Sequence, residues 1–187
     1  MRNDSSNRFV SLAGWCAYAS GVVSIIGIVF LVAMFIGFST NNLRLQRFGA
    51  LNDICVIIQY LLALPITLAL HQRLKAHGLA LSRAAMLIGI AGIIAVVVLQ
   101  WLLVSGVLTF EEQVGPVSVA LLVVGIWLVI TGYLGRSNGS LPHSLLMSIL
   151  AATYLGYPIW AIWLGRQLLS STLTLVEQSP SVRGEIT

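Results

Sequence analysis

Residues 84–110 read AAMLIGIAGIIAVVVLQWLLVSGVLTF, and this stretch contains no Asp, Glu, Lys, Arg or His. A helix needs roughly 20 apolar residues to cross about 30 Å of hydrocarbon, and this stretch is long enough to do so. It lacks the alternation of polar and apolar residues that a membrane β-strand requires. The stretch therefore predicts an α-helix that spans a lipid bilayer.

Four further stretches lack Asp, Glu, Lys and Arg, at residues 9–43, 54–72, 113–135 and 137–165. The chain is 58% hydrophobic and only 9% charged, with a mean hydropathy of +0.95, whereas soluble domains carry about 25% charged residues. We therefore expect an all-α, polytopic transmembrane helix bundle of about five spans, forming a single transmembrane domain over residues 1–187. The spans are predicted at residues 12–38, 50–71, 84–108, 117–134 and 144–165, with a disordered tail at about 177–187.

Charged residues between the predicted spans indicate an orientation. The 72–83 segment carries Lys and Arg without an acid, and the 109–116 segment carries Glu111 and Glu112 without a base. Because basic connections favour the cytoplasmic side, we expect a protein of the cell membrane with its N-terminus in the cytoplasm and its C-terminus outside. The bias is small, since the basic residues divide into Arg2, Arg8, Arg73, Lys75, Arg83 and Arg136 inside and Arg44, Arg47, Arg166 and Arg183 outside.

The net charge of +4 does not indicate a nucleic-acid partner, because the ten Lys and Arg residues are scattered between apolar runs and form no basic face. The expected partner is the lipid bilayer. Small residues, which allow close contact between membrane helices, recur at helical spacing in two spans. They are Ala17, Gly21 and Ser24 in the first, and Ala85, Gly89 and Gly92 in the third. They indicate packing within the bundle or, as the alternative, an interface with a second copy or another membrane protein.

Polar residues inside the apolar runs are the first candidates for function. Asn52 lies seven residues before Gln59, and Asp53 lies seven residues before Tyr60, so the four share one stripe of the second span. A charge in hydrocarbon is costly, so Asp53 is expected to face the bundle interior or water. The other candidates at the same predicted outer end are Gln100, Trp101, Glu111 and Glu112. These residues predict an outward-facing polar pathway for a proton, a cation or a small solute.

Two alternatives stay open for these positions. At the start of its span, Asp53 would favour the helix dipole, or it would pair with Arg44 or Arg47, and its role would then be structural. A second candidate site is an aromatic pocket in the fifth predicted span. It would be formed by Tyr154, Tyr157 and Trp160, although aromatic residues near span ends are more often interfacial anchors.

Catalytic and metal-binding signatures are missing from the sequence. His71, His77 and His143 fall near the predicted cytoplasmic ends of the spans, away from Asp53, and no HExxH or CxxC motif occurs. No serine has a neighbouring base that would make it a nucleophile. We therefore predict no catalytic residue, no metal site and no cofactor. The sequence favours a protein that is not an enzyme.

The second span begins with FGALND at residues 48–53 and ends with LALHQRLK at residues 68–75. In this polar start and basic exit the chain resembles a group of small bacterial multi-pass membrane proteins of unknown function, over its first three predicted spans. The resemblance implies a bacterial cytoplasmic membrane and about five or six helices. It brings no functional residues with it.

These observations favour a non-catalytic multi-pass membrane protein that binds a lipid or apolar ligand, or that is a subunit of a membrane assembly. The small-residue stripes, the short connections and the missing catalytic groups support this hypothesis. The alternative is a small-solute or proton-coupled transporter or channel that uses the stripe around Asp53. Five spans are few for a complete pathway, so that alternative requires a homo-oligomer.

Overall fold

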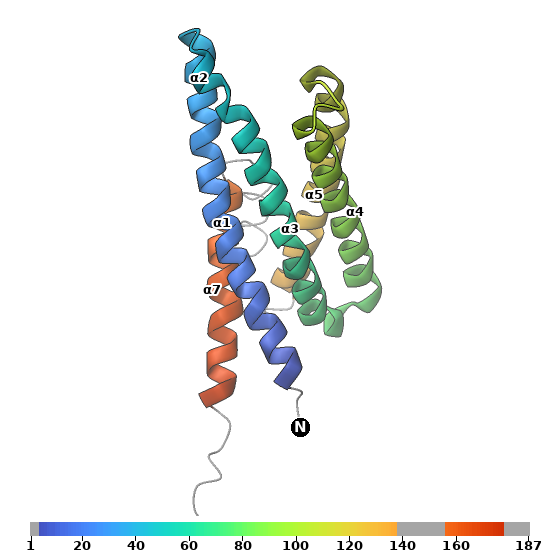
Figure 1. The fold of residues 1–187 in the computed structure, drawn as a ribbon. Helices are drawn as coiled ribbons and strands as arrows, with labels where there is room; N and C mark the ends of the chain where they lie inside the picture. Colours follow the sequence, from blue (N-terminus) through green and yellow to red (C-terminus); the bar gives the residue numbers. More distant parts are fainter. Residues whose placement is uncertain (1–3, 138–155, 178–187) are drawn as a thin grey trace, which may run out of the picture.

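The computed structural model describes residues 4–137 and 156–177, and these lie in helices or short connections (Figure 1). The helices are α1 (Asp4–Ser39), α2 (Leu43–Gln46), α3 (Phe48–Leu74), the 3-10 helix η1 (Lys75–His77), α4 (Leu79–Val104), α5 (Phe110–Ser137) and α7 (Gly156–Glu177). The described residues contain no strand. The predicted all-α fold is confirmed.

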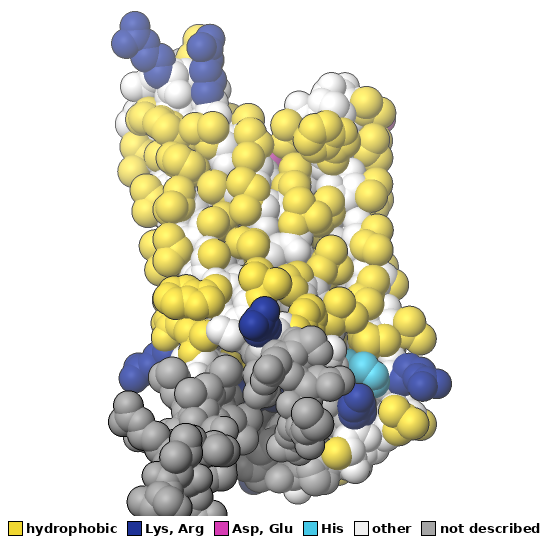
Figure 2. Space-filling view, turned by 60° about the horizontal axis from the view of Figure 1, so that its bottom comes forward, with side chains coloured by type: hydrophobic (Ala, Val, Ile, Leu, Met, Phe, Trp, Pro, Cys, Tyr) yellow, Lys and Arg dark blue, Asp and Glu magenta, His cyan; other side chains and the backbone are white. Residues whose placement is uncertain are grey.

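Four segments are long and apolar enough to cross a bilayer, namely Arg8–Ser39, Leu43–Leu74, Leu79–Val104 and Phe110–Ser137. They correspond to the first four predicted spans. Of the fifth predicted span, the part from Gly156 onwards lies in α7, and residues 144–155 lie outside the described residues, as does the predicted tail beyond Glu177. Figure 2 shows a band of hydrophobic side chains on the surface, with most Lys and Arg side chains towards its two ends. These are the features of an integral membrane protein.

Helix α4 ends before the predicted residue 108 because the chain turns at Gly106, whose φ of 74° lies in the left-handed region. The N–H of Val107 donates to the carbonyl of Leu102 at 2.9 Å, and the N–H of Gly106 donates to the carbonyl of Leu103 at 3.0 Å. This pair of bonds is the Schellman arrangement, which satisfies the last carbonyl groups of a helix. The apolar run continues through this turn, so hydropathy alone missed it.

Helix α5 begins before the predicted residue 117 because Thr109 and Glu112 cap it. The backbone N–H and the hydroxyl of Thr109 each donate to Oε2 of Glu112 at 2.8 Å, and the N–H of Glu112 donates back to Oγ1 of Thr109 at 3.4 Å. A Thr-x-x-Glu capping box satisfies the first N–H groups of a helix in this way. Glu112 therefore has a structural role at the start of α5.

Helices α1, α3 and α7 form one group and α4 and α5 form a second (Figure 1). Helix α3 contacts both α1 and α4 and so joins the two groups. In Figure 1, α3 lies close to α1 at the end that carries α2 and approaches α4 at the opposite end. The two groups are thus most closely joined near η1.

Helix α7 runs antiparallel to α1. A Cβ atom at Gly21 would lie 2.8 Å from the side chain of Ile162, and one at Gly14 would lie 2.9 Å from that of Leu169. Glu177 therefore lies at the end of the bundle where α1 begins (Figure 1). The predicted topology places the two termini on opposite faces, and the described helices differ from it. An apolar run indicates lipid contact or burial, but it carries no information about the direction in which the chain crosses.

The small residues serve contacts between helices of this chain. A Cβ atom at Gly89 would lie 2.7 Å from the ring of Trp127, and one at Gly92 would lie 3.0 Å from the side chain of Val124. Helices α4 and α5 can approach this closely because the two glycines of α4 have no side chain. Ala17, Gly21 and Ser24 are likewise buried in α1.

Candidate functional site

A cavity of about 340 Å³ lies between α3, α4 and α5, and α1 and α7 each contribute one side chain to it. It occupies the half of the bundle nearer to α2, close to the start of α3 and the end of α4. The lining residues are Leu31, Asn52, Val56, Gln59, Tyr60, Val96, Gln100, Val117, Leu121, Val124, Gly125, Leu128 and Tyr157. The polar groups among these described lining residues are amides and phenols, and none of these side chains carries a charge. The walls are otherwise aliphatic.

Helix α3 supplies the polar wall of the cavity. Asn52, Val56, Gln59 and Tyr60 are spaced so that they share one face of the helix, and all four are buried. Three residues of the stripe predicted from the sequence therefore meet at one cavity.

The side chain of Gln59 is only 6% exposed and lines the cavity. Its backbone carbonyl accepts a hydrogen bond from Ser20, but its side-chain amide has no hydrogen-bond partner in the described part of the chain. A primary amide offers two donors and one acceptor. Buried polar groups are nearly always satisfied, so this amide is available to a molecule in the cavity.

Gln100 brings a second amide to the cavity from α4. Its Oε1 accepts a hydrogen bond of 2.8 Å from Nε2 of Gln113 on α5, and both side chains are buried. This bond orients the Gln100 amide, and its Nε2 donates to no group within residues 4–137 or 156–177. Gln113 is thus a supporting residue that the sequence analysis did not single out. Two glutamines on consecutive apolar spans were the available signal.

A hydrogen-bond chain ties three helices together beside the cavity. Oγ of Ser20 on α1 donates to the carbonyl of Gln59 at 3.2 Å and lies 2.8 Å from the hydroxyl of Tyr157 on α7. A serine hydroxyl has one proton, so with that proton on the Gln59 carbonyl the Tyr157 hydroxyl is the donor to Ser20. The phenol of Tyr157 is thereby held at the cavity wall.

Asp53 lies at the edge of this face, half-buried, and does not line the cavity. Its carboxylate accepts one hydrogen bond, of 3.5 Å, from the side-chain amide of Asn52. Among the described residues it forms no ion pair with Arg44, Arg47 or any other base. The carboxylate of Asp53 is therefore linked to the cavity by its hydrogen bond with Asn52.

The remaining residues of the predicted polar pathway lie elsewhere. Trp101 is 63% exposed on the outside of α4, and Glu111 and Glu112 are exposed in the first turn of α5. None of the three lines the cavity. The seven-residue spacing identifies residues that share a helix face, but proximity to a span end does not show which way a side chain points.

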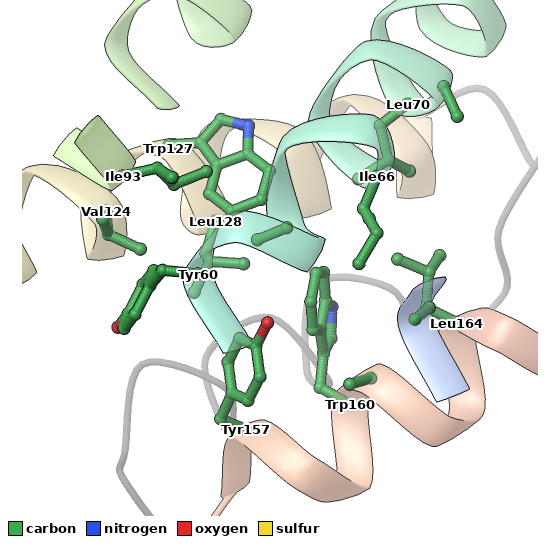
Figure 3. Packing of buried hydrophobic residues seen from close by; sticks show 14 of the residues in the cluster. Tyr60, Ile66, Leu70, Ile93, Val124, Trp127, Leu128, Tyr157, Trp160 and Leu164 are labelled. Carbon is green, nitrogen blue, oxygen red and sulfur yellow. The ribbon is translucent and has the colours of Figure 1, made fainter. Parts of the chain in front are cut away.

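The described residues of the predicted aromatic pocket do not form one site in the structure. Tyr157 and Trp160 are buried, with ring centroids 5.6 Å apart, while Tyr154 lies outside the described residues. Tyr157 also lies beside Tyr60, at 6.3 Å between centroids, and Trp160 meets Trp127 edge-on at 6.2 Å (Figure 3). Tyr157 therefore belongs to the cavity, and Trp160 belongs to the hydrophobic core behind it.

The apolar wall that α5 contributes, which includes Leu121, Val124 and Gly125, could not be predicted from the sequence. Aliphatic side chains in a membrane span carry no signal that separates a cavity wall from a lipid-facing surface. Within the described residues, no three His, Cys, Asp or Glu side chains lie close enough together to hold a metal ion. Comparisons with protein-family models, curated proteins and solved structures found no match.

Proposed function

We propose that this membrane protein binds a lipid or another apolar ligand in the cavity between α3, α4 and α5, without catalysing a reaction. The observation that carries the proposal is the buried amide of Gln59 in the cavity wall, which has no hydrogen-bond partner among residues 4–137 and 156–177. Leaving such a group unsatisfied costs about 1–3 kcal/mol. A ligand with a hydrogen-bonding group would recover this energy on binding.

The size and the lining of the cavity support the same function. Ligand sites have volumes of about 300–1,000 Å³ and combine apolar walls with a few placed polar groups. The cavity of about 340 Å³ has such walls from α4 and α5, facing the amides of Gln59 and Gln100. This lining suits a molecule with an apolar body and a polar end.

The geometry favours binding over transport. The transport hypothesis depends on Asp53, which lies outside the cavity lining, and the described lining residues include no carboxylate, imidazole, amine or guanidinium group. In the proposed orientation the N-terminus is cytoplasmic, so the cavity lies in the outer half of a bacterial cytoplasmic membrane. A role as an assembly subunit is compatible with ligand binding.

The test compares two valines of α5. Val117 lines the cavity, whereas Val119 is 62% exposed and does not. Val117→Phe would fill part of the cavity, and Val119→Phe adds the same bulk to the outer surface. The wild type and both variants would be purified in a mild detergent, and their bound small molecules would be extracted and quantified by mass spectrometry.

We expect one apolar species to be retained in a fixed ratio by the wild type and by the Val119→Phe variant, and to be lost from the Val117→Phe variant. If all three proteins retain the same molecules in the same amounts, the cavity is not the binding site. If none retains any, water occupies the cavity and satisfies the Gln59 amide, and the proposal is wrong.

A further inference from the structure

The cavity shares two residues with a groove on the outer surface of α5. Leu121 and Gly125 line both spaces. The groove has a volume of about 520 Å³, and the other described residues that line it are Ser118, Leu122, Ile126, Val129 and Ile130. The Ser118 hydroxyl donates to the carbonyl of Val114 in its own helix at 2.7 Å, so the groove presents an apolar surface.

Gly125 has no packing role among the described residues. A Cβ atom there would meet no atom within 4 Å, in contrast to Gly89 and Gly92, where it would meet Trp127 and Val124. A glycine inside a helix is destabilising by roughly 0.5–1 kcal/mol relative to alanine. Gly125 therefore lines both the cavity and the groove without a side chain to separate them.

Charge restricts what the cavity can accept. The polar lining groups Asn52, Gln59 and Gln100 are neutral amides, and the carboxylate of Asp53 is hydrogen-bonded to the amide of Asn52. An anionic group would lack a cationic partner among the described lining residues. A cationic group would find no acid there. An uncharged hydroxyl or carbonyl oxygen matches the unpartnered donors of Gln59 and Gln100.

We propose that the cavity holds the uncharged, oxygen-bearing end of a single-chain lipid, and that its hydrocarbon chain leaves sideways past Gly125 into the groove on α5. This inference rests on the proposed function and adds the class of ligand and its route. Most of the described residues that line the groove are apolar and exposed, so a hydrocarbon chain lying there would contact apolar side chains. Only the polar end needs to enter the protein.

The test uses two photoreactive alcohols, 1-octanol and 1-hexadecanol, each with a diazirine group next to the hydroxyl. They would be crosslinked to the detergent-solubilised wild type, to Gly125→Phe and to Val119→Phe, and labelled peptides would be mapped by mass spectrometry. Gly125→Phe adds a phenyl ring between the cavity and the groove, whereas Val119→Phe adds a phenyl ring to the same helix away from both spaces. Gly125→Leu repeats the test with a smaller side chain.

In the wild type and in Val119→Phe, both alcohols should label peptides from α3 and α4. In Gly125→Phe, hexadecanol labelling should fall at least about tenfold, because the cavity of about 340 Å³ is too small to hold the whole chain once its exit is blocked. Octanol labelling should change by less than about twofold. Retained octanol labelling also shows that the variant is folded.

Each other outcome overturns a defined part of the inference. If Gly125→Phe and Gly125→Leu leave hexadecanol labelling unchanged, the chain does not leave past this residue. If they abolish the labelling by both alcohols, position 125 belongs to the site of the polar end, and the sideways route is wrong. If neither alcohol labels the wild type, the proposed binding function itself fails.

Competition tests the charge of the ligand. Unlabelled hexadecanol should displace the hexadecanol probe, while hexadecyl sulfate and hexadecyltrimethylammonium at the same concentration should not. If either charged compound displaces the probe as effectively as hexadecanol does, the site does not select an uncharged polar end.

Discussion

The contact between Gly89 and Trp127 allows a quantitative test of how α4 packs against α5. In Gly89→Ala the new methyl carbon would lie 2.7–2.9 Å from three ring atoms of Trp127, a side chain that is 1% exposed and cannot swing away into lipid. Gly125→Ala makes the same chemical change on the neighbouring helix, where a Cβ atom meets nothing within 4 Å. Both variants gain the same roughly 0.5–1 kcal/mol from replacing glycine in a helix.

That gain cancels in the comparison, so the difference between the two variants is the cost of overpacking at Gly89, about 1–3 kcal/mol. Unfolding free energies would be measured by denaturant titration of the purified proteins in one mild detergent. In a Trp127→Leu background, whose smaller and more flexible side chain can move aside, the cost of Gly89→Ala should fall below about half of its original value. If Gly89→Ala and Gly125→Ala differ by less than about 0.5 kcal/mol, the close contact between α4 and α5 is not as described.

The same titration checks two further predictions. Glu112→Ala removes half of the capping box with Thr109 and should lower the unfolding free energy by more than Glu111→Ala in the same turn. Equal effects of the two substitutions would argue against capping. Gln113→Leu leaves the buried Oε1 of Gln100 without its donor and should cost about 1–3 kcal/mol. Replacing both glutamines by Leu should recover most of that loss, and a double variant less stable than Gln113→Leu would contradict this account.

The sequence predicted the cavity wall on α3 better than the other walls. Asn52, Gln59 and Tyr60 are polar residues in an otherwise apolar span, and their spacing places them on one face before any partner helix is known. Asp53 belongs to the same sequence pattern, yet the rotation of α3 leaves it at the edge of that face, outside the cavity lining. A shift of one residue turns a side chain by about 100° on a helix, and only packing against α1 and α4 fixes where that face ends.

The site residues that the sequence predicted near the ends of α4 and α5 do not line the cavity, apart from Gln100. Trp101, Glu111 and Glu112 lie at the right height but point away from the cavity. Height along a span follows from counting residues, since each residue adds about 1.5 Å to a helix. The direction of a side chain follows from the rotation of its helix, which depends on contacts that are distant in sequence.

By itself, the sequence determined that the protein is an all-α membrane protein, where most of its long helices lie, and that polar groups gather on one face of α3. Charged groups are unfavourable in hydrocarbon, and every backbone N–H and C=O there needs a hydrogen-bond partner within the protein. Composition is therefore enough to predict spanning helices. The tertiary structure decided the antiparallel pairing of α7 with α1, the exclusion of Asp53 from the cavity lining, and the position of Gly125 between the cavity and the groove on α5. These features depend on how closely particular side chains approach, and helices that are apolar on all sides contain no pattern that specifies their neighbours.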